Sequence, residues 1–265
     1  MKLSKSDHRI TLSVRLTYAK VFPYFMTVKE HYERYLGNFY SWMVGDFTEK
    51  QQEQENFFRN SKIHPIFSGV AVDLGCGHGL QTVSLANVGF AVHAVDFNPQ
   101  LLTELKKRIG NRDISFTEAH LLEYLYAIRL KPELIVCMGD TLTHLSGQDQ
   151  VEELIRLSAQ KLEKGGKLIL SYRELATDLT NEKRFIPVKS DEHRIHMCYL
   201  EYLPGYVKVF DVLYELESDG WKQHVSWYPK LRIPVSLVLS LFEKYNLRLA
   251  KQEIIAGLTY LIAEK

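Results

Sequence analysis

The sequence predicts an α/β protein whose core is a doubly wound, mostly parallel sheet of seven strands. Two observations lead to this prediction. Short apolar segments alternate with helical segments between residues 70 and 171, and strands that alternate with helices pair in parallel. The apolar segments are also unbroken, which is typical of strands covered by helices on both faces.

The first five expected strands are separated by clear helix signals. Asn98 and Pro99 open one helix, because Asn is a strong N-cap residue and Pro is favoured at the first helical position. Gly110 ends that helix. The expected strands cover 70–73, 91–95, 114–117, 134–138 and 167–171, and the expected helices cover 80–87, 99–109 and 151–162.

The pattern changes after residue 172. Segments 194–202, 207–216 and 221–228 alternate with period two, and Asp219-Gly220 between two of them is a strong hairpin signal. We therefore expect an antiparallel insertion over 177–233. A helix over 234–245 and strands over 247–254 and 258–263 return the chain to the main sheet, so the core is expected to comprise 61–176 and 234–265.

The N-terminal part, residues 1–60, is rich in aromatic residues and is expected to form a helical lid. Over 28–43 the apolar residues follow the spacing of one helical face. This face is expected either to pack on the protein core or to cover a ligand. It does both if the part of the core that it covers is a binding site. The residues of this face are Tyr32, Tyr35, Leu36, Phe39, Tyr40 and Met43. The other aromatic residues of this part are Tyr18, Phe22, Tyr24, Phe25, Trp42 and Phe47.

Composition excludes several classes of protein. Lys and Arg number 33 and Asp and Glu 32, so the net charge of +1 lacks the basic excess expected of a nucleic-acid or membrane-surface binder. Cys76, Cys137 and Cys198 match no zinc spacing and are too few for a disulfide framework. With no signal peptide or membrane span visible, we expect a cytoplasmic protein without a metal site.

The most informative stretch runs from Val70 to Gly79. A buried strand ends at Asp73 and enters a loop with glycine at 75, 77 and 79. Glycines let such a loop turn sharply and approach a ligand closely. Asp96 ends the next strand, about 20 residues on, where nucleotide-binding sheets place the acid that contacts a ribose.

The spacing of this loop separates two kinds of nucleoside ligand. A dinucleotide site has G-x-G-x-x-G and holds a pyrophosphate at the helix N-terminus. Here the spacing is G-x-G-x-G and Asp73 precedes it. Since a carboxylate repels pyrophosphate, the loop favours a nucleoside that carries an ammonium group and no phosphate.

Asp73-Leu74-Gly75-Cys76-Gly77-His78-Gly79 together with Val95-Asp96-Phe97-Asn98 resembles the first two motifs of the class I S-adenosylmethionine-dependent methyltransferases. Residues 137–145 resemble the segment that ends the fourth strand, and the order of elements is similar over 70–265. The aromatic N-terminal helix and the insertion are similar to the small-molecule branch, including glycine N-methyltransferase-like enzymes. The resemblance implies a Rossmann-like enzyme that transfers a methyl group from S-adenosylmethionine to a small-molecule amine or hydroxyl.

The resemblance also implies which residues contact this cofactor. Residues near its methionine part would be Asp73, Gly75, Cys76, Gly77 and Gly79. Residues near its ribose and adenine would be Asp96, Phe97, His120 and Leu121, and Met138 and Gly139 would face its centre. The family often has an acidic residue where this chain has His120; Glu118 stands two positions earlier.

Candidates for catalysis follow the fourth and fifth strands, at whose carboxyl ends ligands collect in such sheets. His144 is the candidate general base, Asp140 would orient the acceptor, and Tyr172 and Arg173 would face the same crevice. Alternatively, Asp140 caps a helix, His144 is a core histidine and Arg173 forms a structural salt bridge. Tyr40, Trp227 and Tyr228 are candidates for the substrate wall, unless the last two only pack on a sheet.

Three other functions share parts of this pattern. A nucleic-acid methyltransferase would use the same cofactor, but the net charge and the absence of an Asn-Pro-Pro-Tyr-type motif disfavour it. A nicotinamide oxidoreductase would need the phosphate-binding spacing. A non-catalytic module that binds S-adenosylmethionine stays open. The expected partner is a small molecule rather than nucleic acid, and a homodimer is a possible assembly.

Overall fold

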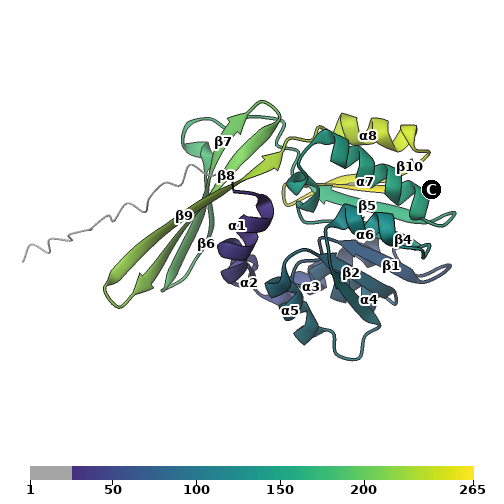
Figure 1. Cartoon of the computed structure of the whole chain (residues 1–265), viewed down its shortest axis with the longest axis horizontal. Coiled ribbons are helices and arrows are strands. Elements are labelled where there is room, and N and C mark those ends of the chain that lie inside the picture. Colours follow the sequence, from purple (N-terminus) through teal and green to yellow (C-terminus); the bar gives the residue numbers. More distant parts are fainter. Residues whose placement is uncertain (1–25) are drawn as a thin grey trace, which may run out of the picture.

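A computed structural model describes residues 26–265 and places the chain in two parts (Figure 1). A seven-stranded sheet carries helices on both faces, and a smaller antiparallel sheet stands beside it. The predicted fold class is therefore confirmed. Tyr18, Phe22, Tyr24 and Phe25 lie outside the described residues.

The main sheet has the strand order β10-β11-β5-β4-β1-β2-β3. Its neighbours pair in parallel, except that β11 is antiparallel to both β5 and β10. The strands are β1 (Val70–Leu74), β2 (Ala91–Asp96), β3 (Ile114–Glu118), β4 (Leu134–Cys137), β5 (Lys167–Tyr172), β10 (Arg248–Ile255) and β11 (Leu258–Glu264). The order reverses between β1 and β4, so the crevice at their carboxyl ends is the expected ligand site.

Three helices pack on each face of this sheet. The larger core cluster lies under α6, α7 and α8, and two smaller clusters lie under α3, α4 and α5. The helices are α3 (Phe47–Asn60), α4 (Leu80–Asn87), α5 (Pro99–Arg108), α6 (Leu121–Ala127), α7 (Gln148–Lys161) and α8 (Val235–Lys244). The sequence analysis did not predict α3, which is mostly polar, or α6, which has only seven residues.

The prediction of a single helix over 28–43 is wrong. The segment forms α1 (Val28–Arg34), the 3-10 helix η1 (Leu36–Asn38) and α2 (Tyr40–Val44). The helix is interrupted at Tyr35 and Phe39, on either side of Gly37, where a Cβ atom would come within 2.6 Å of the Tyr32 carbonyl oxygen. Because that oxygen belongs to the backbone of α1 and cannot move aside freely, glycine is needed for this turn.

The insertion forms a four-stranded antiparallel sheet in the order β6-β7-β8-β9. Its elements are η3 (Asn181–Arg184), β6 (Phe185–Ser190), β7 (Arg194–Leu203), β8 (Tyr206–Glu217) and β9 (Gly220–Leu231). All lie within the predicted insertion, but β6 was not predicted. Helix α1 lies between this sheet and the main sheet, so the N-terminal segment contacts both parts (Figure 1).

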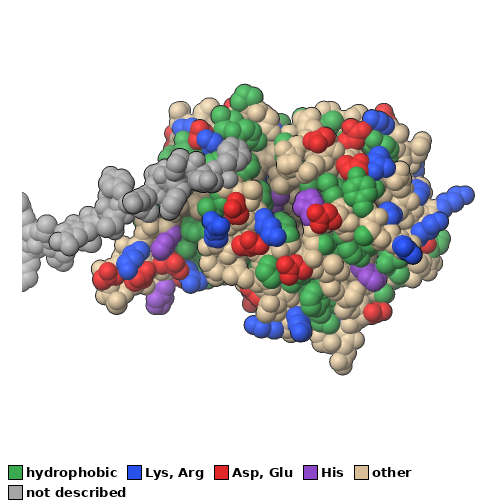
Figure 2. Space-filling model, viewed as in Figure 1, with side chains coloured by type: hydrophobic (Ala, Val, Ile, Leu, Met, Phe, Trp, Pro, Cys, Tyr) green, Lys and Arg blue, Asp and Glu red, His purple; other side chains and the backbone are tan. Residues whose placement is uncertain are grey.

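Charges of both signs are interspersed on the face of the molecule shown in Figure 2. No continuous basic stripe crosses this face, which agrees with the balanced composition. Within residues 26–265, no helix has the length and apolar character needed to cross a membrane.

Candidate functional site

The glycine loop between β1 and α4 is shaped by what lies against it. Gly75 has φ +74°, and a Cβ atom there would lie 2.2 Å from Thr141 Cγ2. Gly79 has φ +98°, and its Cβ atom would lie 2.5 Å from Leu105 Cδ1. Both positions therefore require glycine for backbone conformation and for packing. A Cβ atom at Gly77 would come no closer than 3.8 Å to another residue, the Tyr40 hydroxyl, so the loop is open on that side.

Asp96 fixes the open part of this loop. Its Oδ2 accepts a hydrogen bond of 2.8 Å from the Gly77 N–H, and its Oδ1 accepts one of 2.8 Å from the Asn98 N–H. Burial raises the pKa of Asp96, while these backbone hydrogen bonds oppose the shift. Each oxygen keeps a lone pair that can accept from a hydroxyl group of a ligand.

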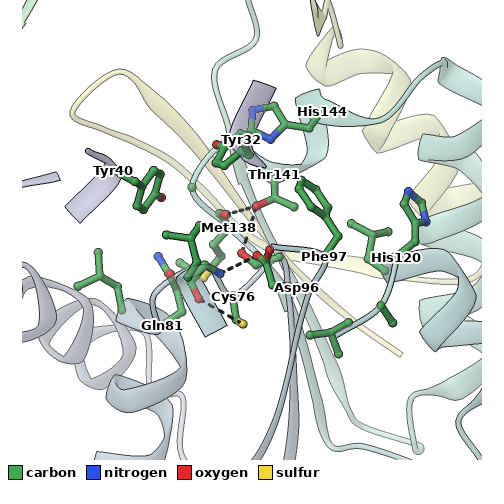
Figure 3. A pocket seen from close by; sticks show the side chains of 18 of the residues that line it. Tyr32, Tyr40, Cys76, Gln81, Asp96, Phe97, His120, Met138, Thr141 and His144 are labelled. Atoms are coloured by element: carbon green, nitrogen blue, oxygen red, sulfur yellow. Dashed lines mark hydrogen bonds between the residues drawn. The ribbon is translucent and has the colours of Figure 1, made fainter. Parts of the chain in front are cut away.

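A cavity of about 140 Å³ opens above the loop (Figure 3). Most of the predicted cofactor residues line it, and they come from the ends of β1, β2, β3 and β4. The predicted residues that line it are Tyr40, Gly75, Cys76, Gly77, Asp96, Phe97, His120, Leu121, Met138, Gly139 and His144. The crevice predicted from the sequence is thus present, and it brings these residues together.

Sequence reasoning missed Gln81 and Thr141 as lining residues and named Tyr32 only as part of an aromatic face. Gln81 is a polar residue at the second position of α4, and that position alone only weakly indicates contact with a ligand. Thr141 belongs to the 3-10 helix η2 (Thr141–His144), and its hydroxyl donates to the Met138 carbonyl oxygen over 3.0 Å. Its contact with Gly75 arises only in the folded sheet.

A larger cavity of about 890 Å³ adjoins the first. Phe97, Ala119, His120, His144 and Leu145 line both. The first cavity is smaller than the roughly 300–1,000 Å³ of small-molecule sites and the second lies within that range. The two form one continuous site, and His144 stands at their junction.

His144 lies in an enclosed environment. Its Nε2 is buried and has no hydrogen-bond partner. The rings of Tyr32 and Tyr228 stand edge-on to the imidazole, each with centroids 5.6 Å away. Burial, with a contribution from the Lys230 charge, lowers the pKa of His144 to about 3. The imidazole is therefore neutral near pH 7 and presents a nitrogen toward the junction of the cavities.

Asp140 is held by two cations instead of lining the cavity. Lys230 Nζ lies 2.8 Å from its Oδ2, the Arg173 guanidinium contacts the same oxygen, and the Arg173 N–H donates to Oδ1 over 2.6 Å. Burial opposes ionisation, but Lys230 and Arg173 hold the pKa of Asp140 well below its usual range. Because Lys230 belongs to β9, this ion pair joins the antiparallel sheet to the end of β4.

Three other predicted residues also lie outside this cavity. Asp73 is buried behind the loop and accepts a 2.6 Å hydrogen bond from Thr82, and burial raises its pKa to about 7. Gly79 packs on Leu105. Tyr172 lies fully buried in the main core.

The prediction that Trp227 forms part of the substrate wall is wrong. Its ring lies beside Phe210 on one face of the antiparallel sheet, whereas the adjacent Tyr228 points to the other face and contacts His144. Successive residues of a strand face opposite sides. Tyr228 therefore supports the site from behind His144, and Trp227 faces away from it.

Comparisons with known proteins agree with this geometry. The family described as "Methyltransferase domain" matches residues 71–166. Residues 71–166, which run from β1 to the start of β5, therefore form a methyltransferase domain. The glycine N-methyltransferase of Rattus norvegicus is 26% identical over 51% of this chain and 57% of its own length. The chain thus spans little more than half of the curated relatives that it matches.

Solved methyltransferase structures share the whole arrangement. The CcbJ methyltransferase from Streptomyces caelestis has a TM-score of 0.68 at 16% identity, covering 91% of this chain and 98% of its own. An amino pentose methyltransferase from Micromonospora echinaspora, solved with S-adenosylmethionine bound, has a TM-score of 0.66 at 12% identity, covering 84% and 93%. The fold of the methyltransferase domain with its antiparallel insertion is therefore shared with these proteins.

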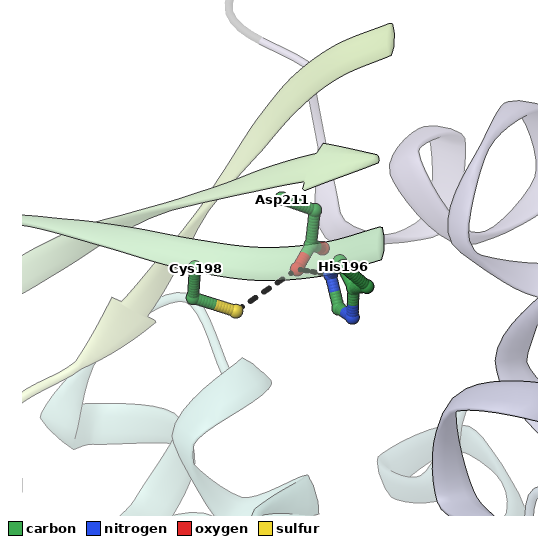
Figure 4. A group of neighbouring side chains, drawn as sticks. All are labelled: His196, Cys198 and Asp211. Carbon is green, nitrogen blue, oxygen red and sulfur yellow. Dashed lines mark hydrogen bonds and ion pairs between the residues drawn. The ribbon is translucent and has the colours of Figure 1, made fainter. Parts of the chain in front are cut away.

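A buried carboxylate attaches α1 to the insertion, next to the methyltransferase domain (Figure 4). Asp211 on β8 accepts from His31 Nε2 at 2.8 Å and from His196 Nε2 at 2.9 Å, and the Cys198 thiol donates to it over 3.2 Å. His31 Nδ1 lies 2.8 Å from Ser226 Oγ. Both oxygens of the carboxylate thus accept hydrogen bonds, which hold α1, and with it Tyr32, against His144.

Because burial lowers the pKa of the His144 imidazole, the free energy of unfolding depends on pH. An unfolded histidine titrates near 6.5 and the folded one near 3, so between these values the unfolded state binds more protons and stability falls as pH falls. We expect acidification from pH 7 to pH 5 to cost about 2 kcal/mol through this group. His144→Phe should reduce this loss in urea unfolding, and exposed His193→Gln should not. Equal pH slopes for wild type and His144→Phe would contradict the assignment.

Removal of the Asp211 carboxylate should loosen α1. Asp211→Ala leaves two buried imidazoles without their partner, so we expect a loss of about 2–4 kcal/mol in the free energy of unfolding. Urea denaturation measures this loss, and limited proteolysis should cut the 26–44 segment faster. Replacement of the exposed Asp113 by Ala is the control. An Asp211→Ala variant as stable and as resistant as wild type would show that the network does not hold the helix.

Proposed function

We propose that this protein binds S-adenosylmethionine in the cavity above the glycine loop and transfers its methyl group to an amine or hydroxyl of a small molecule in the adjoining cavity. One observation carries the proposal: two cavities, one lined by the glycine loop and Asp96 and one open to solvent, meet at a buried neutral imidazole with a free nitrogen. A bound nucleoside and an acceptor would then be neighbours at His144.

The residues of the first cavity fit this cofactor. Gly77 and Gly139 leave room where a Cβ atom would otherwise project. Asp96 offers both carboxylate oxygens to a pair of ribose hydroxyls, and Phe97 with Leu121 offers an apolar surface to a base. Within residues 26–265, no Lys or Arg side chain lines this cavity, in keeping with a ligand that carries no phosphate. When bound, S-adenosylmethionine supplies a methyl group on a positively charged sulfur, which is already activated for displacement.

The protein's own part is alignment and proton removal. The rings of Tyr32, Tyr40 and Phe97 line the first cavity, and aromatic faces favour a cationic centre by about 0.5–2 kcal/mol each. Holding an acceptor against this wall supplies the orientation that an in-line displacement needs. His144 Nε2 then accepts the proton that a hydroxyl or ammonium acceptor must lose.

The acceptor cavity is polar enough for a small, hydrophilic molecule. Lys29, Glu118, Glu123 and Gln150 line it together with His120. Proteins similar to this chain include a glycine N-methyltransferase and a sugar N-methyltransferase. These names support a nitrogen acceptor on a small polar molecule such as an amino acid or amino sugar, with a hydroxyl acceptor as the alternative.

Cofactor binding tests the first half of the proposal. Titration calorimetry should detect binding of S-adenosylmethionine and of S-adenosylhomocysteine to the wild type. Asp96→Ala should weaken both roughly 10–100-fold, because charge-assisted hydrogen bonds contribute about 1.5–3 kcal/mol. The exposed Asp113→Asn is the control, and thermal unfolding checks that Asp96→Ala folds. No binding by the wild type would overturn the proposal.

Turnover tests the second half. In a panel of amines, amino sugars and alcohols, formation of S-adenosylhomocysteine should identify the acceptor. His144→Asn should lower kcat roughly 10²–10⁴-fold for a hydroxyl acceptor, since that is the range of general base catalysis, and less for a neutral amine. Its affinity for S-adenosylmethionine should stay near wild type. Full turnover at saturating acceptor would remove His144 from the mechanism, and binding without turnover across the panel would favour a non-catalytic module.

A further inference from the structure

Within residues 26–265, Asp211 is a buried carboxylate that forms no ion pair with a lysine or arginine. Its neighbours at ion-pair distance are the imidazoles of His31 and His196. Asp140 is buried to a similar extent, but it pairs with two cationic side chains. Because buried charges in proteins are paired or coordinate metals, the difference indicates a cation of another kind at Asp211.

Three side chains that commonly bind metals meet at one oxygen of this carboxylate (Figure 4). Asp211 Oδ1 lies 2.9 Å from His196 Nε2 and 3.2 Å from Cys198 Sγ, and the three ligand atoms all lie within 4.8 Å of one another. Zinc bonds to nitrogen and oxygen at about 2.0–2.2 Å and to sulfur at about 2.3 Å, so its ligand atoms stand roughly 3–4 Å apart. The spacing found here is close to that of ligands around a single zinc ion.

The antiparallel sheet holds these ligands in place. His196 and Cys198 are two residues apart on β7, so their side chains lie on the same face. Asp211 stands directly opposite Cys198 on β8. The cysteine spacing in the sequence does not show such a site, because it uses one cysteine and takes its other ligands from two strands. Cys198 is only partly buried, so an ion can reach the site from its side.

The second oxygen of the carboxylate is oriented by α1. His31 Nε2 lies 2.8 Å from Asp211 Oδ2, and His31 Nδ1 lies 2.8 Å from Ser226 Oγ. In metal sites, hydrogen bonds of this kind orient the ligating carboxylates. His196 Nδ1 is buried without a hydrogen-bond partner. The His196 proton can therefore move from Nε2 to Nδ1 without breaking a hydrogen bond of Nδ1, which frees Nε2 for a cation.

We propose that Asp211, His196 and Cys198 bind a zinc ion through Oδ1, Nε2 and Sγ, with a fourth position left for water. Nitrogen, sulfur and carboxylate oxygen are the ligands that zinc takes in proteins. Burial and the adjacent carboxylate raise the pKa of the Cys198 thiol, so the sulfur stays protonated until a cation binds. Binding then forms the bond from sulfur to zinc and releases the thiol proton to solvent. The dication, the thiolate and the carboxylate together are neutral.

This metal site is separate from the two cavities. None of its three ligands lines either of them, so the site does not depend on the proposed methyl transfer. Its role is structural, since it joins β7 to β8 and, through the hydrogen bond of His31, fixes α1 on the sheet. Because Tyr32 on α1 lines the first cavity, the ion also supports the position of that wall.

Cobalt(II) titration of the full chain, freed of metal with a chelator, tests the proposal. Cobalt takes the same ligands as zinc and absorbs light, so one equivalent should produce a thiolate-to-cobalt charge-transfer band. Cys198→Ser should abolish this band, and Cys137→Ser, which removes a buried thiol from β4, is the matched control. His31→Leu should keep the band but lower the affinity for zinc roughly 10–100-fold, as loss of an outer hydrogen bond does.

Each outcome decides for or against the metal site. One zinc per chain, with a band lost in Cys198→Ser and kept in Cys137→Ser, supports the proposal. A wild type without the band, or a band that survives in Cys198→Ser, overturns it, and a protonated imidazole then balances Asp211. Circular dichroism checks that each variant folds. If Cys198→Ser does not fold, His196→Gln keeps the thiol and should lower the zinc affinity by more than His31→Leu does; an unchanged affinity contradicts the site.

Discussion

The site depends on the contact between the loop after β1 and the 3-10 helix after β4. The reversal of strand order brings these two carboxyl ends together, and Gly75 lets Thr141 pack where any Cβ atom would clash. From this contact the loop faces Asp96 on one side, and η2 carries His144 to the other. The cavity is thus a consequence of sheet topology, and the side chains that line it are positioned by backbone that has little freedom to move.

Two buried carboxylates connect the antiparallel sheet to that arrangement. Asp140 pairs with Lys230 of β9, and Asp211 accepts from His31 of α1. A buried carboxylate left without partners is costly, so each requires its partners to stay in place. Together they set α1 and β9 on either side of His144, whose imidazole lies between Tyr32 and Tyr228. The neutral state of this histidine follows from the enclosure that these connections create.

The two faces of the antiparallel insertion differ in what they contact. Its inner face holds Asp211 and Tyr228 against α1 and the site, while its outer face presents an aromatic row that includes Phe210 and Trp227. Because side chains alternate along each strand, neighbouring residues such as Trp227 and Tyr228 have different surroundings, and only one of them supports the site.

The sequence by itself determined the α/β class, nearly all strands, the glycine loop and Asp96, because these depend on local patterns: apolar runs, helix caps and glycine spacing. It did not reveal the break at Gly37, the contact of Thr141 with Gly75, or the pairing of Asp140 with Lys230, which join residues far apart in the chain. It also assigned Trp227 to the substrate wall, although the strand's period of two places only one of Trp227 and Tyr228 on the inner face. Which face is inner is decided by the tertiary structure, since burial against α1 is a property of the assembled sheet and not of the strand.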